Sequence, residues 1–472
     1  MNSPNRIGHL TILGAGIAGL SAGYYAHKAG FPFTVLEAEK EIGGNCRTIE
    51  HDGFLFDSGA HRFHDKDASQ TREIKRLLGD EIREISAPSQ IYHNGVFIDF
   101  PLSLPDLVRK LGSPFLFKAA FEVAKANLSA KNHDTNFEEF VLRAYGRTIA
   151  EFFLLGYTQK LWGVPPRRLS PLVLGGRLKG LDLATFLFQK LGHGRKNAKH
   201  MEASFYYPRK GIQSIPETLG NACGRDHIRT GSRITRIRHD GRAIRGVEVN
   251  GRDWIETESV ISTLPLTSLL GMLNPPPPPE ITRLAERLGF RDLVLCALFL
   301  NRPSVSGCAS FYFPDPRFPF SRIYEPKNRS LVMSPPDRTA LVAEFPCLRG
   351  DDVWNAADAE ILEMIAPPLV DIGLLRRTEI LDWRVIRMGY AYPVIEKDMD
   401  DTLRPIFRYL RGFANLQVTG RGASFEYVHM HDLLRRGQTI IESLARGRDG
   451  AVLGDPGQPQ HAADIGPPIL EV

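Results

Sequence analysis

The chain has 472 residues, of which 43% are hydrophobic and 24% are charged, a balance that excludes a disordered or fibrous protein. This length exceeds what one hydrophobic core usually supports, so we expect two compact units. The net charge of +5 comes from 59 basic and 54 acidic residues spread over many segments, which is too diffuse for a nucleic-acid-binding protein but suits small anionic molecules.

The first elements along the chain form a β-α-β unit. Residues 9–13 are predicted as a short buried strand, residues 19–29 as a helix packed on it, and residues 33–36 as a second parallel strand. The first nine residues are mostly polar and the apolar segment after them is short, so we expect neither a signal peptide nor a membrane span.

The turn between the first strand and the helix has the spacing of a dinucleotide-binding site. Gly14 permits a tight bend, Gly16 lets backbone amides approach a diphosphate, and Gly19 lets the helix pack closely on the strand. The helix N-terminus offers unpaired N–H groups to phosphates, and Glu37 ends the next strand, where it can accept hydrogen bonds from a ribose. A packed turn without a ligand is the weaker interpretation, because strand, helix and acidic residue occur together. The predicted cofactor contacts here are Gly14, Gly16, Ile17, Ala18, Gly19, Glu37 and Ala38.

A second glycine pair, Gly43 and Gly44, follows the acidic residue closely and favours FAD over a nicotinamide cofactor. It provides another place where backbone can approach the diphosphate, and Arg47 can add charge-assisted contacts. The predicted contacts in this segment are Gly44, Asn45, Cys46 and Arg47.

The middle of the chain, from about 86 to 205, is predicted to be an inserted helical region. Aromatic residues cluster along residues 137–144 and 149–157. The longest apolar run, residues 115–124, is interrupted by two charged residues, and we expect a core helix there rather than an amphipathic helix at a membrane surface.

The rest of the chain returns to strands and ends in a helix. Short β-prone runs with turn signals occupy residues 228–260. The five prolines at 275–279 predict a stiff crossing between domains and not part of a helix. Residues 290–395 carry mixed signals of a substrate domain, a helix is expected over 432–445, and the last stretch, residues 447–472, is predicted to be disordered.

The five cysteines lie far apart and include no CxxC pair, so neither a zinc site nor a disulfide framework is predicted. The histidines show no metal-binding spacing either, and we expect no metal. A reducing cytoplasm is the simplest setting. We expect a small-molecule substrate and no nucleic-acid partner, and the sequence leaves the oligomeric state open.

The sequence resembles the flavoprotein superfamily of amine oxidases, protoporphyrinogen oxidases and UDP-galactopyranose mutases, in which the glycine turn is followed by a G-G-x-x-x-T segment, here residues 43–48. Four more stretches carry the resemblance: residues 57–64, 156–163, 391–394 and 420–431. The resemblance extends to about residue 445 and is closest to mutase-like proteins described as FAD-dependent oxidoreductases.

The resemblance implies an α/β fold in which a discontinuous Rossmann-type FAD-binding domain carries an inserted mixed α+β substrate domain. The expected FAD-binding domain comprises residues 1–85, 205–270 and 405–446, and the expected substrate domain comprises residues 86–204 and 271–404.

The resemblance also implies residue roles. His61 would lie near the flavin, Trp162 would line the active site, and Tyr392 and Tyr427 would offer hydroxyls to a polar substrate. Each of the four is also compatible with an ordinary packed or hydrogen-bonded side chain. Arg421 follows a glycine in the C-terminal motif and would pair with the diphosphate. The further implied cofactor contacts are Gly59, Ala60, His61, Ile234, Gly420, Arg421 and Met430.

Two departures from the mutases shape the expected activity. Gly180 stands where the mutases have a diphosphate-binding arginine, with Arg177 and Lys179 as possible substitutes, and His429 and His431 replace acidic residues. UDP-galactopyranose is therefore not the expected substrate. We expect an FAD-dependent oxidoreductase that moves hydride from a small polar substrate, such as a sugar or sugar nucleotide, to flavin N5. The alternatives are a non-redox NDP-hexopyranose/furanose mutase that uses reduced FAD as a nucleophile, and a flavin-binding protein without catalysis.

Overall fold

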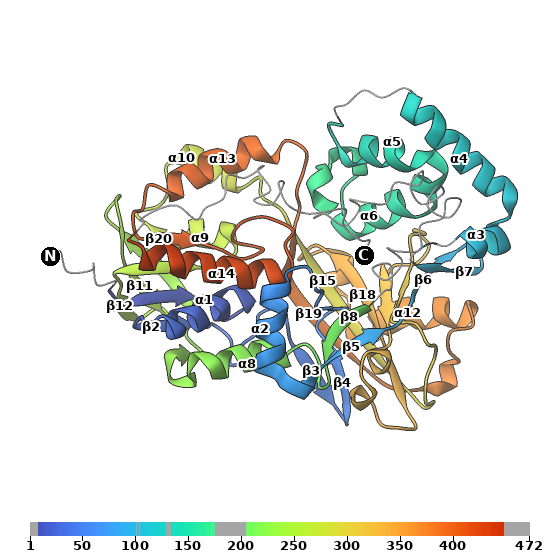
Figure 1. Cartoon of the computed structure of the whole chain (residues 1–472), viewed down its shortest axis with the longest axis horizontal. Coiled ribbons are helices and arrows are strands. Elements are labelled where there is room, and N and C mark those ends of the chain that lie inside the picture. The colour runs from blue at the N-terminus through green and yellow to red at the C-terminus, as the bar shows by residue number, and fades with distance from the viewer. Residues whose placement is uncertain (1–7, 101, 103, 129–133, 175–203, 448–472) are drawn as a thin grey trace.

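The computed structural model describes residues 8–447 except 101, 103, 129–133 and 175–203. The described residues form five sheets, and the two largest organise the chain (Figure 1). The first elements and the last helix lie together on one side, and a larger sheet with a group of helices lies on the other. The predicted tail from 448 onward falls outside the described residues.

The smaller sheet is parallel throughout and has the strand order β20-β13-β1-β2-β9. Its strands come from the beginning, the middle and the end of the chain. Because ligands bind at the carboxyl ends of parallel strands, this order brings distant segments to one edge. The strands are β1 (Leu10–Leu13), β2 (Phe33–Leu36), β9 (Ile228–Arg229), β13 (Ser259–Ser262) and β20 (Leu416–Val418).

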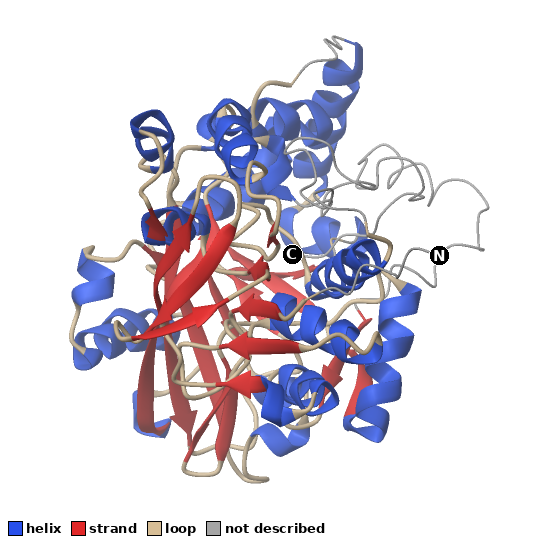
Figure 2. Ribbon diagram, turned by 90° about the vertical axis from the view of Figure 1, so that its left-hand side faces the viewer, coloured by secondary structure: helices blue, strands red, loops and turns tan. Residues whose placement is uncertain are grey.

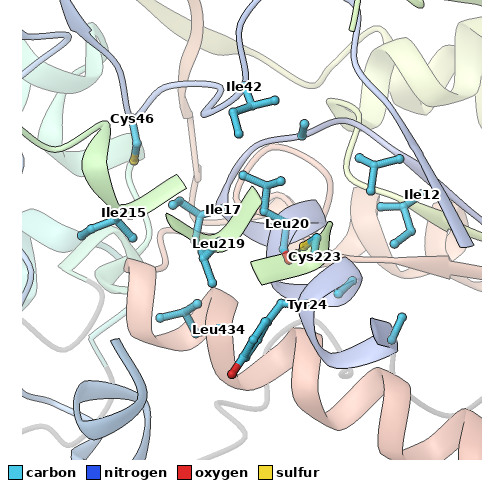
Figure 3. Packing of buried hydrophobic residues seen from close by; sticks show 14 of the residues in the cluster. Ile12, Ile17, Leu20, Tyr24, Ile42, Cys46, Ile215, Leu219, Cys223 and Leu434 are labelled. Carbon is cyan, nitrogen blue, oxygen red and sulfur yellow. Dashed lines mark hydrogen bonds between the residues drawn. The ribbon is translucent and has the colours of Figure 1, made fainter. Parts of the chain in front are cut away.

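Four helices share the core on one face of this sheet, where Ile12, Leu20, Leu219 and Leu434 are fully or nearly buried (Figure 3). Helix α14 can approach α1 closely because residue 437 is glycine: a Cβ there would lie 2.3 Å from the Ser21 hydroxyl oxygen. The helices are α1 (Ile17–Lys28), α2 (Ala68–Leu78), α8 (Ser214–Cys223) and α14 (Met430–Ala445).

A second core covers other side chains of the same strands, including Leu13 and Val260. A four-stranded sheet and three helices close it. The strands are β10 (Ile234–His239), β11 (Ile244–Val249), β12 (Asp253–Glu256) and β14 (Leu273–Asn274), and the helices are α9 (Leu266–Met272), α10 (Pro279–Ala285) and α13 (Met399–Leu410).

The prediction for the five prolines was wrong. Pro279 is the first residue of α10, a position where the missing N–H costs no hydrogen bond. Leu273 and Ile281, on either side of the proline run, are buried in the same core as Leu403. The run therefore lies within this half and is not a crossing between domains.

The larger sheet has seven strands in the order β19-β15-β18-β17-β16-β6-β7, and only the β16–β6 pair is parallel. Figure 2 shows long strands in the lower part of the molecule with a group of helices above them. The strands are β6 (Ser89–His93), β7 (Val96–Phe100), β15 (Phe290–Leu300), β16 (Ser310–Tyr312), β17 (Arg322–Tyr324), β18 (Thr339–Cys347) and β19 (Ile380–Pro393). Helices α11 (Asp352–Asn355) and α12 (Asp358–Asp371) contact this sheet.

Strands β6 and β7 correct the prediction that the inserted region is helical from residue 86. They form a hairpin around Asn94 and Gly95, both with positive φ. Two further antiparallel pairs connect the halves: β3 (Thr48–His51) with β4 (Phe54–Asp57), and β5 (Ile82–Ser86) with β8 (Ser204–Pro208).

The inserted helices begin only after β7 and share a core with it and with Tyr312 of β16. They are α3 (Leu104–Leu111), α4 (Ser113–Leu128), α5 (Phe137–Ile149) and α6 (Leu155–Trp162). The prediction of a core helix over 115–124 was wrong for two residues of α4, because the side chains of Phe117 and Phe121 are 76% and 69% exposed. Among the residues that the structure describes, no helix is both long and apolar enough to cross a membrane.

Candidate cofactor and active site

The glycine turn lies at the carboxyl end of β1. Gly14 has a φ of 99°, and its N–H donates to the Leu36 carbonyl at 2.8 Å. A Cβ on Gly19 would lie 1.9 Å from the Gly14 carbonyl oxygen, so a larger residue at 19 would separate the helix from the turn. Gly16 precedes the first helical residue, Ile17, and leaves the first N–H groups of α1 without a side chain in front of them.

The second glycine loop packs directly on the first. The Gly43 N–H donates to the Ala15 carbonyl at 2.8 Å, and a Cβ on Gly44 would lie 3.2 Å from the Gly16 Cα. A Cβ on Gly16, by contrast, would meet nothing closer than 3.9 Å. The two loops therefore form a cradle of bare backbone that a diphosphate could approach.

Glu37 lies beside this cradle and is 8% exposed. One carboxylate oxygen accepts the Ala15 N–H at 2.7 Å, and the other accepts the Glu39 N–H at 2.9 Å. A carboxylate accepts more than two hydrogen bonds, so Glu37 retains capacity for ribose hydroxyls. Ile234, another predicted contact, is the first residue of β10 and is buried.

Segments from the C-terminal end complete the cradle. Gly420 has a φ of 116°, and a Cβ placed on it would lie 3.5 Å from the Ala18 Cβ. Met430 is the first residue of α14, and its sulfur lies 3.9 Å from the Cys46 thiol. Burial raises the pKa of the Cys46 thiol to about 12, so Cys46 packs as a neutral thiol.

A turn after β4 presents His61. The Ser58 hydroxyl donates to the Asn45 carbonyl at 2.6 Å and accepts the Arg47 N–H at 3.0 Å, which ties the turn to the second glycine loop. The Ala60 N–H donates to a Glu344 carboxylate oxygen at 2.7 Å. The position of His61 is thus set from both sides.

His61 is held in its neutral form. Burial of the ring, which is the largest cause, and the positive charges of Arg421, Arg322 and Arg329 together lower its pKa to about 3. Neutral imidazole can donate or accept a hydrogen bond without adding charge to the site.

The residues present fit a bound flavin. Two buried nitrogens, Arg47 Nε and His61 Nε2, have no hydrogen-bond partner among the described residues. Buried polar atoms in native proteins are nearly always satisfied, so these nitrogens indicate a polar group that completes the site. Together with the glycine cradle they match a dinucleotide that carries a polar ring.

Three aromatic side chains from distant segments form a wall. Trp162 ends α6, Tyr392 lies near the end of β19, and Tyr427 lies in the loop before α14. The Trp162 ring centre is 6.0 Å from that of Tyr392 and 5.7 Å from that of Tyr427, both edge to face, while the two tyrosines are stacked at 6.1 Å. The structure thus brings three of the four predicted catalytic residues into contact.

The Arg421 guanidinium lies against this wall. It is 5.1 Å from the Tyr427 ring centre and 5.8 Å from that of Tyr392, and it donates to the Val428 carbonyl at 2.9 and 3.2 Å. Its positive charge also acts on His61 and Cys46. Arg421 therefore connects the aromatic wall to the His61 turn; its predicted contact with a diphosphate stays a prediction.

The sequence reasoning missed a buried ion pair next to His61. Arg322 and Glu344 face each other on neighbouring strands β17 and β18, with Nη2 and a carboxylate oxygen 2.7 Å apart. Glu344 is 2% exposed and also accepts from Ala60. The signal was a single acidic residue inside the otherwise apolar strand Thr339–Cys347, since a charge there requires a buried partner.

Lys160, in the same stretch as Trp162, was also missed. Its ammonium donates to the carbonyls of Phe313, Asp315 and Phe320 at 2.7, 2.6 and 3.0 Å. These three bonds attach α6 to the loop between β16 and β17.

The remaining predicted features lie at the edge of this site, away from it, or outside the described chain. All five cysteines are free, buried thiols. His51, Asp52 and Asp382 could each offer a metal-ligand atom within 4.8 Å of the others, but this group is partly exposed on the β3–β4 hairpin and β19. Gly180, Arg177 and Lys179 lie outside the described residues. His429 precedes α14, and its N–H donates to Asp432 at 2.8 Å.

The chain belongs to the flavin-containing amine oxidoreductase family, whose sequence pattern matches residues 17–439. The FAD prediction and the predicted fold class are confirmed by this membership and by the structural neighbours. The protein is thus a member of an FAD-dependent enzyme family with a Rossmann-type domain.

Relatives in this family carry different activities. The chain is 26% identical to protoporphyrinogen oxidase 1 of Arabidopsis thaliana over 294 residues. This alignment covers 56% of this chain and 54% of the relative. It is 22% identical to coproporphyrinogen III oxidase of Bacillus subtilis over 56% of this chain and 62% of the relative, and 25% identical to a probable UDP-galactopyranose mutase of Klebsiella pneumoniae over 37% and 45%. The chain therefore spans between 45% and 62% of the length of these curated relatives.

Solved structures match over nearly the whole chain. Reduced UDP-galactopyranose mutase superposes with a TM-score of 0.79 at 18% identity and covers 95% of this chain and 98% of its own. A putative protoporphyrinogen oxidase from Exiguobacterium superposes with a TM-score of 0.74 at 20% identity, with 93% and 99% covered. At these identities the likeness establishes the fold.

Proposed function

We propose that this protein is an FAD-dependent oxidoreductase that acts on a small, polar, anionic substrate, with sugars and sugar nucleotides as the first class to test. The observation that carries the proposal is the arrangement of the aromatic wall with Arg421, whose guanidinium lies 5.1 Å from the Tyr427 ring centre. Aromatic rings pack against the flat face of a sugar or a base, and a cation beside them attracts a phosphate or a carboxylate.

Bound FAD supplies a two-electron acceptor that takes hydride at flavin N5. In this proposal the chain's own residues orient the substrate and exclude water. Trp162, which is 2% exposed, packs behind the two tyrosines and keeps water out of this side of the site. The Tyr392 and Tyr427 hydroxyls offer hydrogen bonds to substrate oxygens. His61 adds a neutral donor or acceptor at the flavin side.

The cofactor roles in the proposal follow from the cradle. The glycine turn and the Gly43–Gly44 loop would hold the diphosphate, Glu37 the ribose, and Met430 at the start of α14 would place a helix N-terminus at the flavin ring. Their test is the binding of FAD itself, described with the predictions below.

A non-redox mutase is the second candidate. The observation that favours it is the match over 98% of reduced UDP-galactopyranose mutase, together with the Trp162, Tyr392 and Tyr427 wall. In such a reaction bound reduced FAD would supply a nucleophile that displaces the nucleotide diphosphate from the anomeric carbon. The diphosphate would rejoin that carbon after the sugar ring has opened and reclosed at a different size, with no net electron transfer.

One anaerobic experiment separates the two candidates. The oxidised holoenzyme is mixed with NDP-hexopyranoses and free sugars, and also with protoporphyrinogen and coproporphyrinogen because relatives are named for them. Loss of the yellow flavin absorbance without added reductant supports the oxidoreductase and identifies the substrate class. Furanose product that forms only after chemical reduction, with the flavin still reduced at the end, supports the mutase. If neither occurs with any of these compounds, the proposed substrate class is wrong.

We also propose a cytoplasmic location, because all five cysteines are free, buried thiols, as expected for a chain kept in a reducing compartment. To check the reducing environment, the thiols of the denatured protein are blocked directly on cell lysis and then counted. We expect all five cysteines to react as free thiols.

A further inference from the structure

Helix α4 lies at the outer edge of the molecule (Figure 1). Two of its phenylalanines, one turn apart in the sequence of the helix, have exposed side chains. Phe117 is 76% and Phe121 is 69% exposed. On the preceding helix α3, Val108 is also exposed, at 47%. Two phenyl rings left in water at neighbouring positions are unusual, because each would gain from burial.

Among the α4 residues whose burial the structure describes, the exposed ones form one continuous face. At about 100° per residue, its exposed positions fall within an arc of about 140°. Phe117 and Phe121 occupy the middle of this arc, and Lys118 and Lys125 lie along one flank. The exposed positions are Ser113, Pro114, Phe117, Lys118, Phe121, Ala124 and Lys125.

The opposite side of α4 faces the protein. Ala119 is 1% exposed, and Glu122 accepts hydrogen bonds from the Thr148 N–H at 2.6 Å and the Thr148 hydroxyl at 3.0 Å. Glu122 is the sole acidic residue in the α4 sequence. Since its carboxylate is bonded to α5, the charges that α4 presents outward are the two lysines.

The neighbouring helix continues this charge pattern. Asp106 of α3 is 4% exposed and pairs with Arg109 and Lys110, while the Arg109 side chain is 72% exposed. An apolar stripe of aromatic residues with lysine and arginine along its edge is the pattern of a helix that lies in the interface of an anionic bilayer. Basic side chains near such a surface are attracted to the negative head groups.

We propose that the α3–α4 face docks on the surface of a membrane that contains anionic phospholipids. Phe117 and Phe121 enter the boundary between head groups and acyl chains, and Lys118 and Lys125 contact phosphates. The helix lies flat on the bilayer and does not span it. Helix α4 packs on α5, which continues into α6 and Trp162, so the docked face belongs to the same group of helices as the aromatic wall.

The test uses the full-length holoenzyme and vesicles of phosphatidylcholine with or without phosphatidylglycerol, and measures co-sedimentation. We expect binding to the anionic vesicles and a loss of roughly tenfold in affinity per ring, about a hundredfold in all, for the double variant F117S/F121S. The matched control is Leu331→Ser, which removes a side chain that is 77% exposed elsewhere on the surface and should bind like the wild type.

A second variant separates the charge from the apolar contribution. K118E/K125E keeps both rings, and we expect it to lose its preference for phosphatidylglycerol vesicles, while added salt should weaken the wild type in the same direction. Unchanged flavin content in each variant shows that the fold is intact. The proposal is overturned if the wild type does not sediment with anionic vesicles, if F117S/F121S binds as well as the wild type, or if light scattering shows that this face joins two copies of the chain instead.

Discussion

Three arginine side chains near the His61 turn influence the protonation of His61. Arg322 has a carboxylate partner in Glu344, whereas Arg421 donates to a backbone carbonyl and has no carboxylate partner among the residues that the structure describes. Arg329 is 1% exposed and lies 4.4 Å from the Tyr324 ring centre, and its Nε and Nη1 have no hydrogen-bond partner among the described residues. The excess of positive charge, added to burial, keeps the imidazole neutral.

The protonation of His61 predicts a pH-dependent stability. Its pKa is about 3 in the folded protein and about 6.5 when unfolded, so between these values only the unfolded chain binds the proton. The free energy of unfolding therefore decreases as the pH falls below 6.5, and by pH 5 this residue should contribute a loss of about 2 kcal/mol relative to pH 7. Urea unfolding of the wild type and His61→Gln at both pH values measures it. Equal losses in the two proteins would show that His61 is not the group responsible.

Because Arg322 and Glu344 form a buried ion pair, truncation of Glu344 should strongly lower the free energy of unfolding. Glu344→Ala leaves a buried guanidinium without its carboxylate and the Ala60 N–H without its acceptor, so we expect the free energy of unfolding to fall by about 3 to 5 kcal/mol. Glu363→Ala is the control, because its pair with Arg377 is more than half exposed and should contribute less than about 1 kcal/mol. Denaturant titration compares the two variants; similar losses would contradict the prediction.

At the scale of elements, local signals predicted the N-terminal unit and the last helix closely. Strand β2 covers the predicted residues 33–36, and α14 begins two residues before the predicted Asp432. Residues 86–100 were assigned wrongly because the helical pattern that follows was extended backward over them. Asn94-Gly95 is the same turn signal as Asn250-Gly251, and both pairs have positive φ.

The glycine turn predicts the outcome of one substitution. In Gly16→Val the new Cβ meets no protein atom closer than the Gly44 Cα, at 3.9 Å, so we expect the fold to persist. The branched side chain occupies the space in front of the helix N-terminus, and we expect the protein to purify without yellow colour. Gly271→Val is the control, since it also has open space around it but lies in α9, and it should retain FAD. If Gly16→Val binds FAD stoichiometrically, the glycine cradle is not the site that holds the diphosphate.

The whole molecule joins segments from both ends of the chain around one site. The glycine turn, the His61 turn, the β17–β18 ion pair and the loop before α14 come from four separate parts of the sequence. The Tyr207 hydroxyl donates to the Asp57 carboxylate and the Tyr324 hydroxyl donates to the Asp57 carbonyl, both at 2.5 Å, which links the two halves at the end of β4, just before the His61 turn in the chain. A ligand that contacts all these segments should stabilise the chain as a unit.

Removal of FAD should therefore lower the melting temperature of the whole protein. Free FAD at a hundred times its dissociation constant should restore about 2.7 kcal/mol to the free energy of unfolding. A thermal-shift titration of the apoprotein measures the increase with FAD. Riboflavin, which lacks the diphosphate and adenosine, is the matched control and should give a much smaller shift. Equal shifts from both ligands would contradict a diphosphate held by the glycine cradle.

The sequence by itself determined the dinucleotide unit, the cofactor and the family. The signals were glycines at fixed spacing, an acidic residue at a strand end and motifs in a fixed order, and each depends on the backbone conformation of a short segment. Only the tertiary structure decided which side chains meet. Glu344 and Arg322 are 22 positions apart, and Trp162 and Tyr427 are separated by much of the chain, so their contact depends on strand order and helix packing that no local pattern encodes. The exposure of Phe117 and Phe121 was likewise decided by packing, because the same apolar run could have faced the core or the solvent.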